Sequence, residues 1–491
     1  MQVCLTKIAK IDIIFGMIIP EGASKMLRVD ELLNLSREEM ISSSKKFVAS
    51  LCTRYKKNNY IDPSYYQKLE VKRGLRNPDG TGVMAGVTLI GDVQGYEMRD
   101  GVKVPKEGDL IYRGISIKDL INGFVSENRF GYEETVYLLL FGELPTASAL
   151  EDFKQLLCEW SALPPGFTED MIIKAPSNNV MNKLARSILA LYSYDDEPEP
   201  TNLETELFQA LRMIARCPII VAHAYAVKRH YFDNESLYLH RPRQDMSIAE
   251  NFLYSIRRDN LFTDDEAKLL DLCLVLHAEH GGGNNSAFAC RVLSSTGTDI
   301  YSALAAAVGS LKGPKHGGAN QKVNDMLSDI QRNVSNWKDE GEVKDYLVKI
   351  VRKQAYDRKG LIYGMGHAVY TLSDPRAVIL KEFSRKLAEQ KGMVDELDLI
   401  ETIEKLAPGI LMEEKRSDKP VCANVDLYSG FVYKMLGIPE ELFTPIFAIS
   451  RMAGWCAHRI EEFYNSENRI IRPAYKNVEQ LKPYVPLRER K

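Results

Sequence analysis

The chain has 491 residues, of which 45% are hydrophobic, enough to bury a sizeable core in one large domain or two smaller ones. Its net charge is only −3, and acidic and basic residues are interspersed, so the composition favours neither a nucleic acid nor an anionic membrane as a partner. Eight cysteines are scattered without CxxC spacing, which disfavours a zinc site or a disulfide framework and favours a reducing, cytoplasmic location.

The first 25 residues contain one short apolar run, residues 11–19, behind two lysines. Asp12 interrupts this run and no small-residue cleavage site follows it, so we do not expect a secretory signal. We interpret residues 1–25 as sequence upstream of a natural start at Met26. No apolar run approaches the roughly 20 residues that a membrane span requires, so no membrane partner is expected.

Helical patterns dominate the chain. Residues 27–54 are rich in helix formers, with Ser36 and Glu39 at capping-box spacing. Strand-like runs at residues 84–95 and 109–115 predict a small β element. From Lys118 onward apolar residues recur at helical spacing, and helices are predicted at residues 133–141, 148–158, 265–280, 300–311, 319–333, 376–391, 429–436 and 441–463. The sequence therefore predicts a mostly α fold with a minor β element near the N-terminus.

The most informative stretch covers residues 276–320. We interpret it as one long Ala- and Ser-rich helix between two Gly-rich breaks, with His277 and His280 at its start and His316 at its end. Two similar Gly-containing stretches, residues 364–376 and 424–430, follow later in the chain. Histidines and an aspartate in such breaks indicate a site assembled at helix ends.

Each of these residues allows two interpretations. His277 and His280 flank Glu279 and would suit a divalent metal, but HExxH is absent and no third ligand is spaced nearby, so core packing is the alternative. His316 at a helix start would stay neutral beside the helix dipole and donate a hydrogen bond to a carbonyl oxygen, or it would only cap the helix. Asp426 also lies near a helix start, where it would be either a site residue or an ordinary N-cap aspartate.

Arg376 lies in the first turn of a predicted helix, where its charge opposes the dipole. This indicates an anionic ligand, or else a solvated surface charge. The Gly-rich turn before His367 would let backbone amides approach a ligand, although it is neither a P-loop nor a dinucleotide fingerprint.

Taken together, these segments resemble the citrate synthase family over roughly residues 74–473. The motifs that carry the resemblance occur in the family's order and separation, and they are LIYRGISIKDL (110–120), YEETVYLLLFGELPT (132–146), HAEHGGGN (277–284), GPKHGGAN (313–320), GMGHAVY (364–370), DPR (374–376), NVDLYSG (424–430), FAISRMAGWCAH (447–458) and RP (472–473).

The resemblance implies an acyltransferase that condenses acetyl-CoA with oxaloacetate and water to give citrate and free CoA. It places the family's catalytic residues on His316, His367 and Asp426. Asp426 would remove a methyl proton, His316 would hydrogen-bond the thioester oxygen, and His367 would polarise the ketone of oxaloacetate. A carboxylate with an ordinary pKa of about 3.9 needs such donors, because a thioester methyl group is far less acidic.

The resemblance also implies how the substrates are bound. Oxaloacetate would be held by His280, Asn284, Arg376, Arg451 and Arg472, with Arg472 supplied by the partner subunit of a homodimer. The adenine end of coenzyme A would be lined by Ile362, Gly364, Met365 and Gly366. Thr371 stands where some relatives carry a basic residue, so the coenzyme's phosphates would be met by Lys353, Arg358 or Lys359. No metal and no permanently bound cofactor is implied, since acetyl-CoA is a co-substrate.

By the same resemblance, the chain would fold as two domains. Residues 1–73 would form an N-terminal extension and helical arm, residues 74–316 the first part of a large domain, residues 317–430 a smaller mobile domain, and residues 431–491 the return of the large domain with a C-terminal arm. The site would lie in the cleft, and oxaloacetate would order the small domain before acetyl-CoA binds.

Two alternatives to citrate synthesis remain open. Here Glu279, His280 and Gly281 replace the family's common D-H-E, which changes how the histidine is held and leaves the substrate preference open. A 2-methylcitrate synthase would use propionyl-CoA with the same residues, since one methylene changes discrimination by only about 1–3 kcal/mol. A non-catalytic binding protein with the same fold is the second alternative, although it would not need three catalytic residues and three arginines together.

Overall fold

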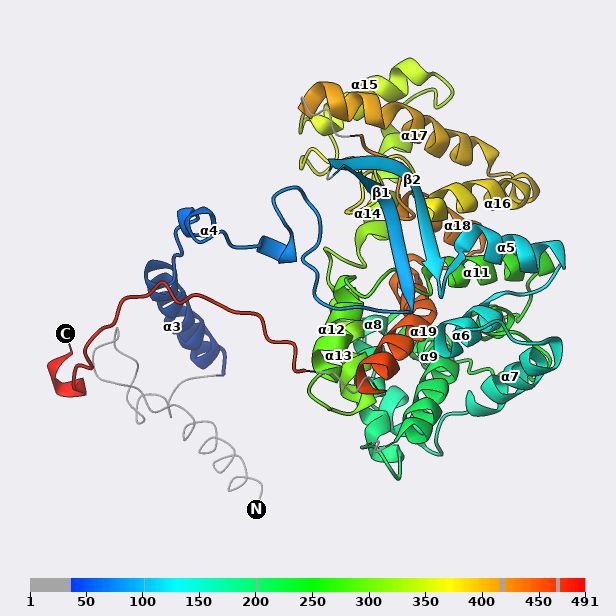
Figure 1. Ribbon diagram of the computed structural model, residues 1–491, viewed down its shortest axis with the longest axis horizontal. Coiled ribbons are helices and arrows are strands. Elements are labelled where there is room, and N and C mark those ends of the chain that lie inside the picture. The colour runs from blue at the N-terminus through cyan, green and yellow to red at the C-terminus, as the bar shows by residue number, and fades with distance from the viewer. Residues whose placement is uncertain (1–36, 101, 200–201, 416–419, 465–468, 491) are drawn as a thin grey trace. The chain divides into compact units, whose positions relative to one another are not determined.

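The computed structural model describes residues 37–100, 102–199, 202–415, 420–464 and 469–490 (Figure 1). The chain divides into two compact units, Met1–Val83 with Pro473–Lys491 as the first and Met84–Arg472 as the second.

The described residues of the first unit include two α-helices, α3 (Arg37–Asn58) and α4 (Ser64–Lys68). The helix predicted at residues 27–54 is thus present from Arg37 onward, while residues 1–36, with the predicted cap Ser36, lie outside the described residues. None of the described side chains of this unit belongs to the hydrophobic core, and Tyr60 and Tyr475 are largely exposed.

The second unit begins with a small antiparallel sheet in the order β1-β2-β3, formed by β1 (Gly91–Arg99), β2 (Val102–Tyr112) and β3 (Ile115–Ser116). The predicted β element is confirmed, but its first strand starts later than expected. Met84, Val87 and Leu89 are exposed, and the N–H of Leu89 donates to the carboxylate of Glu461 at 2.7 Å instead of to a neighbouring strand. Residues 84–89 of this apolar run therefore form an exposed segment, and Ile90 is the first of them to enter the core.

The remainder of the unit is helical, and its helices are α5 (Ile117–Ser126), α6 (Tyr132–Phe141), α7 (Ala147–Trp160), α8 (Val180–Leu191), α9 (Leu203–Phe232), α10 (Ile248–Ile256), α11 (Asp264–His277), α12 (Asn285–Ser294), α13 (Ile300–Lys312), α14 (Ala319–Asn333), α15 (Glu340–Val351), α16 (Pro375–Lys391), α17 (Val394–Lys415), α18 (Asp426–Met435) and α19 (Phe443–Tyr464). The predicted mostly α fold is confirmed. Local signals explain several boundaries: Gly142 ends α6 in the left-handed region at φ 81°, and Thr263 with Glu266 forms a capping box on α11.

One helix prediction was wrong. The stretch between the Gly-rich breaks is not one helix, because α12 ends at Ser294 and α13 begins at Ile300. Gly297 adopts φ 79° in the turn between them, and the Asp299 side chain accepts the N–H of Ser302 at 2.7 Å and so starts the second helix. Both signals are local, but the Ala-rich composition on either side conceals them.

Two helices form the centre of the core. Most residues of α19 from Phe443 to Arg459 are buried, and α19 packs against α6, α8, α9, α11, α12 and α13. It is joined to α9 by an ion pair between Arg459 and Glu206, whose side chains are fully buried and lie 2.8 Å apart. Because α19 also carries Arg451, this core fixes one wall of the predicted site.

The helix α9 is long and apolar enough to cross a membrane, the one such helix among the residues that the structure describes. The search of the sequence for apolar runs missed it, because Arg212 and Arg216 interrupt its apolar residues. Of its most apolar stretch, 78% is buried inside the protein, as in the core helix of a folded domain.

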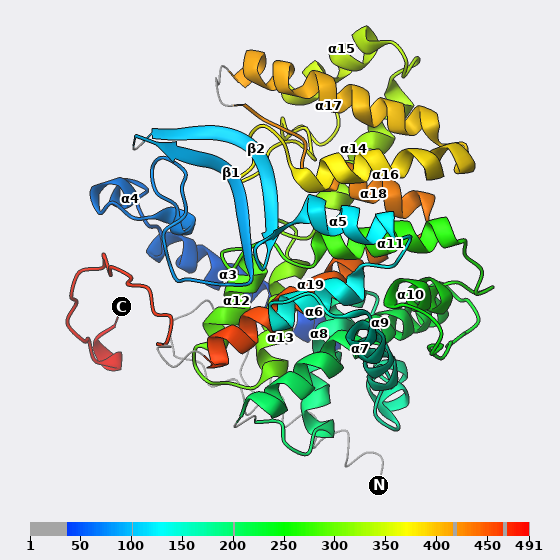
Figure 2. The same ribbon diagram turned by 45° about the vertical axis from the view of Figure 1, so that its right-hand side comes forward.

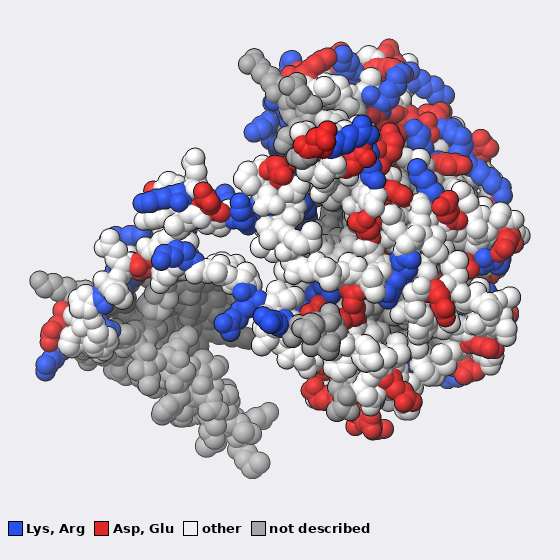
Figure 3. Space-filling view, viewed as in Figure 1, with Lys and Arg blue, Asp and Glu red and all other residues white. Residues whose placement is uncertain are grey.

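Helices α14 to α17 fall within residues 317–430, the stretch predicted as a small domain, and α18 crosses its predicted end at residue 430. Within this group α15 packs on α17, and α18 packs on both α14 and α16 (Figure 2). The division of this unit into a large and a small domain stays a prediction. On the face seen in Figure 3, basic and acidic side chains are interspersed over the second unit without an extended area of one sign.

Candidate functional site

The predicted site residues meet at a cavity of about 120 Å³ in the second unit. It is lined by His280, Asn284, His316, Gly317, Asn320, His367, Arg376, Asn424, Val425, Asp426, Phe443, Thr444, Phe447 and Arg451. The three predicted catalytic residues and four of the five predicted oxaloacetate ligands are therefore brought together. Arg472 is exposed and does not line this cavity, and neither do Ile362, Gly364, Met365 and Gly366.

Most lining residues come from the ends of helices, as the sequence predicted. His280 follows the end of α11, Asn284 caps α12, and His316 lies between α13 and α14. Asp426 is the first residue of α18, and Arg376 lies in the first turn of α16. Arg451 and His367 are exceptions, because Arg451 projects from the middle of the buried helix α19 and His367 lies in the loop between α15 and α16.

Arg451 supplies an unsatisfied cation to the cavity. Its side chain is fully buried, its Nε donates to the carbonyl of His277 at 2.5 Å, and its Nη1 and Nη2 have no hydrogen-bond partner. Burial lowers the pKa of Arg451 to about 10, although the charge of Glu279 opposes this effect. A buried guanidinium with two free N–H groups is suited to a carboxylate ligand.

Arg376 is already paired, contrary to the alternative of a solvated surface charge. Its Nε and Nη2 donate to the two carboxylate oxygens of Asp374 at 3.0 and 2.7 Å, and the group is buried. Asp374 also accepts the backbone N–H groups of Arg376 and Val425 at 3.0 and 3.2 Å. One carboxylate thus fixes the arginine, the start of α16 and the segment before Asp426.

His280 and His367 lie against each other, with ring centroids 5.1 Å apart and planes at 87°. The Nδ1 of His367 accepts the backbone N–H groups of Val369 and Tyr370, both at 3.1 Å, so the ring of neutral His367 carries its proton on Nε2 as a donor. The buried Nε2 of His280 has no partner. Burial, with the positive charge of Arg376, places the pKa of His280 well below its usual value and keeps the ring neutral.

His316 is held by a hydroxyl group. Its Nε2 lies 3.1 Å from Oγ of Ser286, which also accepts the indole N–H of Trp455 at 3.2 Å. Burial, together with the charge of Arg451, lowers the pKa of His316 to about 4. The imidazole is therefore neutral at physiological pH and can donate a hydrogen bond without carrying a charge.

Asp426 has the pKa of a group suited to accept a proton. Burial raises its pKa to about 6, an effect that the charge of Arg376 reduces and that of Asp374 increases. Its backbone N–H donates to Oδ1 of Asn424 at 3.0 Å, while Nδ2 of Asn424 donates to the carbonyl of Gly366 at 2.8 Å. The Asn424 amide thus connects the segment of Asp426 to the segment of His367.

Gly364 and Gly366, which were predicted to contact coenzyme A, also have a structural role, because both lie where the His367 loop meets the segment before α18. Gly364 and Gly366 pair with residues 422–424, through Asn424 N–H to Gly364 O and Gly366 N–H to Cys422 O, both at 2.8 Å. Gly364 adopts φ 83°, and a Cβ added there would lie 2.9 Å from Cβ of Leu427. These glycines let the His367 loop approach α18; their contact with coenzyme A stays a prediction.

Sequence reasoning missed several lining residues, namely Asn320, Asn424, Phe443, Thr444 and Phe447. Asn320, Asn424 and Phe447 are part of the quoted motifs, but nothing in the sequence indicated which motif residues face the cavity. Asn320 donates to Ser429 Oγ at 2.5 Å, and Thr444 donates to the carbonyl of Gly317 at 2.9 Å. Both contacts join residues more than a hundred positions apart in the chain, beyond the reach of local patterns.

The metal interpretation of His277 and His280 finds no ligand set. Within the described ranges, no group of three or more His, Cys, Asp and Glu side chains is placed to hold a metal ion. His277 is buried outside the cavity lining with its ring 4.5 Å from that of Phe447, as core packing requires, but neither of its ring nitrogens has the hydrogen-bond partner expected of a core histidine.

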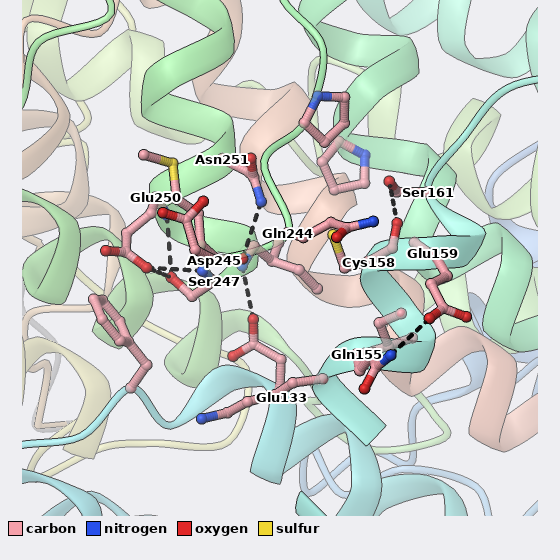
Figure 4. Close-up of a pocket in the computed structure, with 18 of the residues that line it drawn as sticks. Glu133, Gln155, Cys158, Glu159, Ser161, Gln244, Asp245, Ser247, Glu250 and Asn251 are labelled. Carbon is pink, nitrogen blue, oxygen red and sulfur yellow. Dashed lines mark hydrogen bonds between the residues drawn. The ribbon is translucent and has the colours of Figure 1, made fainter. Parts of the chain in front are cut away.

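A larger cavity of about 530 Å³ lies elsewhere in the second unit, where α6, α7 and α10 meet (Figure 4). Its labelled side chains include Glu133, which accepts the N–H of Ile248 at 2.7 Å, and Glu250, which belongs to the capping box of α10. None of the predicted catalytic or substrate-binding residues lines it. The predicted site residues therefore do not lie at the larger of these two cavities.

Comparison with known proteins gives matches to one family. The family model described as citrate synthase, C-terminal domain, matches residues 80–474. The chain is 38% identical to citrate synthase 2 of Bacillus subtilis, in a match that covers 78% of this chain and 93% of that protein. It is 32% identical to the 2-methylcitrate synthase of Shewanella oneidensis, in a match that covers 80% of this chain and 94% of that protein. It also resembles the structure of Thermoplasma acidophilum citrate synthase in ternary complex with carboxymethyl coenzyme A and oxaloacetate, with a TM-score of 0.69 and 26% identity over 86% of this chain and 99% of that one.

Replacing Arg451 by Met tests whether the unpaired guanidinium is the anion ligand. Hydrogen bonds to charged groups contribute about 1.5–3 kcal/mol each, so we expect Arg451→Met to weaken oxaloacetate binding by at least about tenfold in isothermal titration calorimetry. Arg385→Met, which removes a partly exposed arginine of α16 paired with Glu401, is the matched control and should bind as the unaltered protein does. Unchanged affinity in Arg451→Met would contradict the assignment.

Proposed function

The chain belongs to the citrate synthase family, and we propose that it condenses acetyl-CoA with oxaloacetate and water to give citrate and free CoA. The observation that carries the proposal is the meeting of an unpaired buried guanidinium, two neutral histidines and a carboxyl of raised pKa around one cavity of about 120 Å³. A cavity of this size suits a small dicarboxylate but not the whole of an acyl-CoA.

Oxaloacetate would bind first. One carboxylate would lie on the free N–H groups of Arg451, and the other would be met by Arg376 beside His280 and Asn284. The Nε2–H of His367 would then point at the ketone oxygen and polarise the carbonyl carbon for attack. Bound oxaloacetate would order the small domain, and acetyl-CoA would bind after it.

Enolisation of the acyl group would follow. The carboxylate of Asp426 would take a proton from the methyl carbon while His316 donates a hydrogen bond to the thioester oxygen, where negative charge develops. One such preorganised donor is typically worth about 3–4 kcal/mol. The neutral state of His316 matters here, because a neutral imidazole can donate a hydrogen bond to the developing enol oxygen while it remains a weak acid, as the enol is.

Carbon–carbon bond formation would then join the methyl carbon to the ketone carbon, and the ketone oxygen would take up a proton. Water would hydrolyse the thioester of the resulting citryl-CoA, releasing citrate and the thiol of coenzyme A. The proposal needs no metal and no permanently bound cofactor, since the side chains present supply the base and both donors.

The remaining parts of the proposal concern the assembly and the coenzyme. Arg472, which is exposed in the single chain, would complete the site of a second protomer in a homodimer. Ile362, Gly364, Met365 and Gly366 would contact the adenine end of coenzyme A, near the exposed Lys353, Arg358 and Lys359 for its phosphates. A cytoplasmic location is supported by the free state of all seven described cysteines.

A 2-methylcitrate synthase is the second candidate, because curated relatives with that name match nearly as well as the citrate synthases do. It would use propionyl-CoA and the same catalytic residues. The extra methyl group would have to fit beside the side chains that line the cavity next to Asp426 and His316, which include Phe443 and Thr444.

Thiol release with oxaloacetate distinguishes these candidates. We expect faster turnover with acetyl-CoA than with propionyl-CoA, after subtraction of blanks without oxaloacetate that account for the protein's eight cysteines. Asp426→Gly should lose at least about a hundredfold in turnover number, the usual contribution of a general base. A preference for propionyl-CoA would move the function to 2-methylcitrate synthesis, and release from neither by the folded protein would favour a binding role.

The raised pKa of Asp426 predicts an acidic limit to activity. Because the base must be ionised, kcat/KM for the acyl-CoA should fall as the pH drops below about 6 and should level off above it. His316, with a pKa of about 4, stays neutral over this range and adds no second transition there. A profile that is flat from pH 5 to 8 would contradict Asp426 as the base.

A further inference from the structure

His458, in the quoted motif FAISRMAGWCAH, has no part in the mechanism above. It lies on α19, about two helical turns after Arg451, and its side chain is fully buried. It does not line the cavity. A buried histidine with hydrogen-bond partners on both ring nitrogens nevertheless has a defined orientation and tautomer, and one of those partners, Glu279, lies next to His280 in the chain.

The tautomer of His458 follows from its neighbours. The Nη2 and Nε of Arg291 lie 2.7 and 3.2 Å from Nδ1 of His458. A guanidinium can only donate, so Nδ1 accepts and the ring proton is on Nε2. This Nε2–H lies 2.9 Å from Oε1 of Glu279 and donates to it. Arg291 is in turn held by Glu461, Glu462 and Thr88.

Glu279 links His458 to the predicted oxaloacetate ligand His280 through hydrogen bonds. The oxygen that accepts from His458 also accepts the backbone N–H of Gly281, so the carboxylate is bound to the residue that follows His280. The backbone N–H of Glu279 donates to the hydroxyl of Tyr112 at 3.2 Å, which holds the residue before His280. The backbone on both sides of His280 is therefore held by hydrogen bonds. The His280 side chain lines the cavity, and its Nε2 has no hydrogen-bond partner.

The same carboxylate supports the charge of Arg451. Its Oε2 has no hydrogen-bond partner, and a Cβ added at Gly454, one turn after Arg451 on α19, would lie 2.4 Å from it. Burial favours the neutral form of Glu279, but the hydrogen bond from His458, the charge of Arg451 and the hydrogen bond from the Gly281 N–H oppose burial and lower the pKa of this carboxyl. Glu279 is thus an anion close behind the cationic wall of the cavity.

We propose that His458 is a positioning residue for dicarboxylate binding, which acts through Glu279 to orient His280 and to keep a negative charge beside Arg451. This inference rests on the proposed function and extends it to a residue outside the cavity. It predicts that losing the hydrogen bond from His458 to Glu279 raises the KM for oxaloacetate and leaves the KM for the acyl-CoA nearly unchanged. A purely structural role would lower the thermal midpoint without that distinction between substrates.

Substitution of His458 by Gln or by Asn distinguishes the role of Nε2 from the role of Nδ1. In His458→Gln the side-chain amide reaches the position of Nε2 and can still donate to Glu279, whereas in His458→Asn it reaches the position of Nδ1 and serves Arg291 only. We expect His458→Asn to raise the KM for oxaloacetate by at least about tenfold, as for one lost hydrogen bond to a charged group, and His458→Gln to stay within about threefold of the unaltered protein. Thiol-release kinetics and thermal midpoints of both variants measure these effects.

Glu279→Gln keeps the inference testable if His458→Asn does not fold. Glu279→Gln removes the charge that His458 positions, so it should also raise the KM for oxaloacetate selectively. Where both variants fold, the double variant should raise this KM by less than the two single effects combined would predict. Equal kinetics in His458→Asn and His458→Gln, or a normal KM for oxaloacetate in Glu279→Gln, would overturn the inference. Absence of turnover in the unaltered protein would instead refute the proposed function.

Discussion

The buried guanidinium of Arg451 imposes the main physical constraint on this site. Removing a cation from water costs several kcal/mol unless an anion and hydrogen bonds replace the lost hydration, and two of its nitrogens have no partner. Glu279 lies close enough to favour the charge, and Arg376 lies close enough to oppose it. A dicarboxylate that met both arginines would supply the missing compensation. The unliganded site is therefore prepared for an anion before any chemistry begins.

The other side chains are placed relative to this cation by a few polar residues that bridge distant segments. Asp374 joins Arg376 to the segment before Asp426, and Asn424 joins that segment to the His367 loop. Ser286 holds His316 from the other side. Because each bridge joins helix ends, a small rotation of one helix would move a donor or the base relative to the substrate. This geometry explains why a site built at helix ends needs so many fixed contacts.

Much of this site could be predicted from the sequence, because Gly-rich breaks and histidines at helix ends are local signals. His316, His367 and Asp426 were found in that way, and the resemblance to a family supplied their roles. The break at Gly297 was missed although its signals are local, since the Ala-rich flanks suggested continuity. The pairing of Arg376 with Asp374, the bridge made by Asn424 and the chain from His458 to Glu279 depend on which helices pack together. Residue spacing contains no information about such contacts, and only the folded chain brings them together.

The most direct test of this account is a crystal structure of the protein with oxaloacetate bound. The account predicts one carboxylate on Nη1 and Nη2 of Arg451, the second beside Arg376, and the ketone oxygen within hydrogen-bond distance of Nε2 of His367. A dicarboxylate bound elsewhere, with the Arg451 guanidinium still unpaired in the bound state, would contradict the claim that this buried cation organises the site.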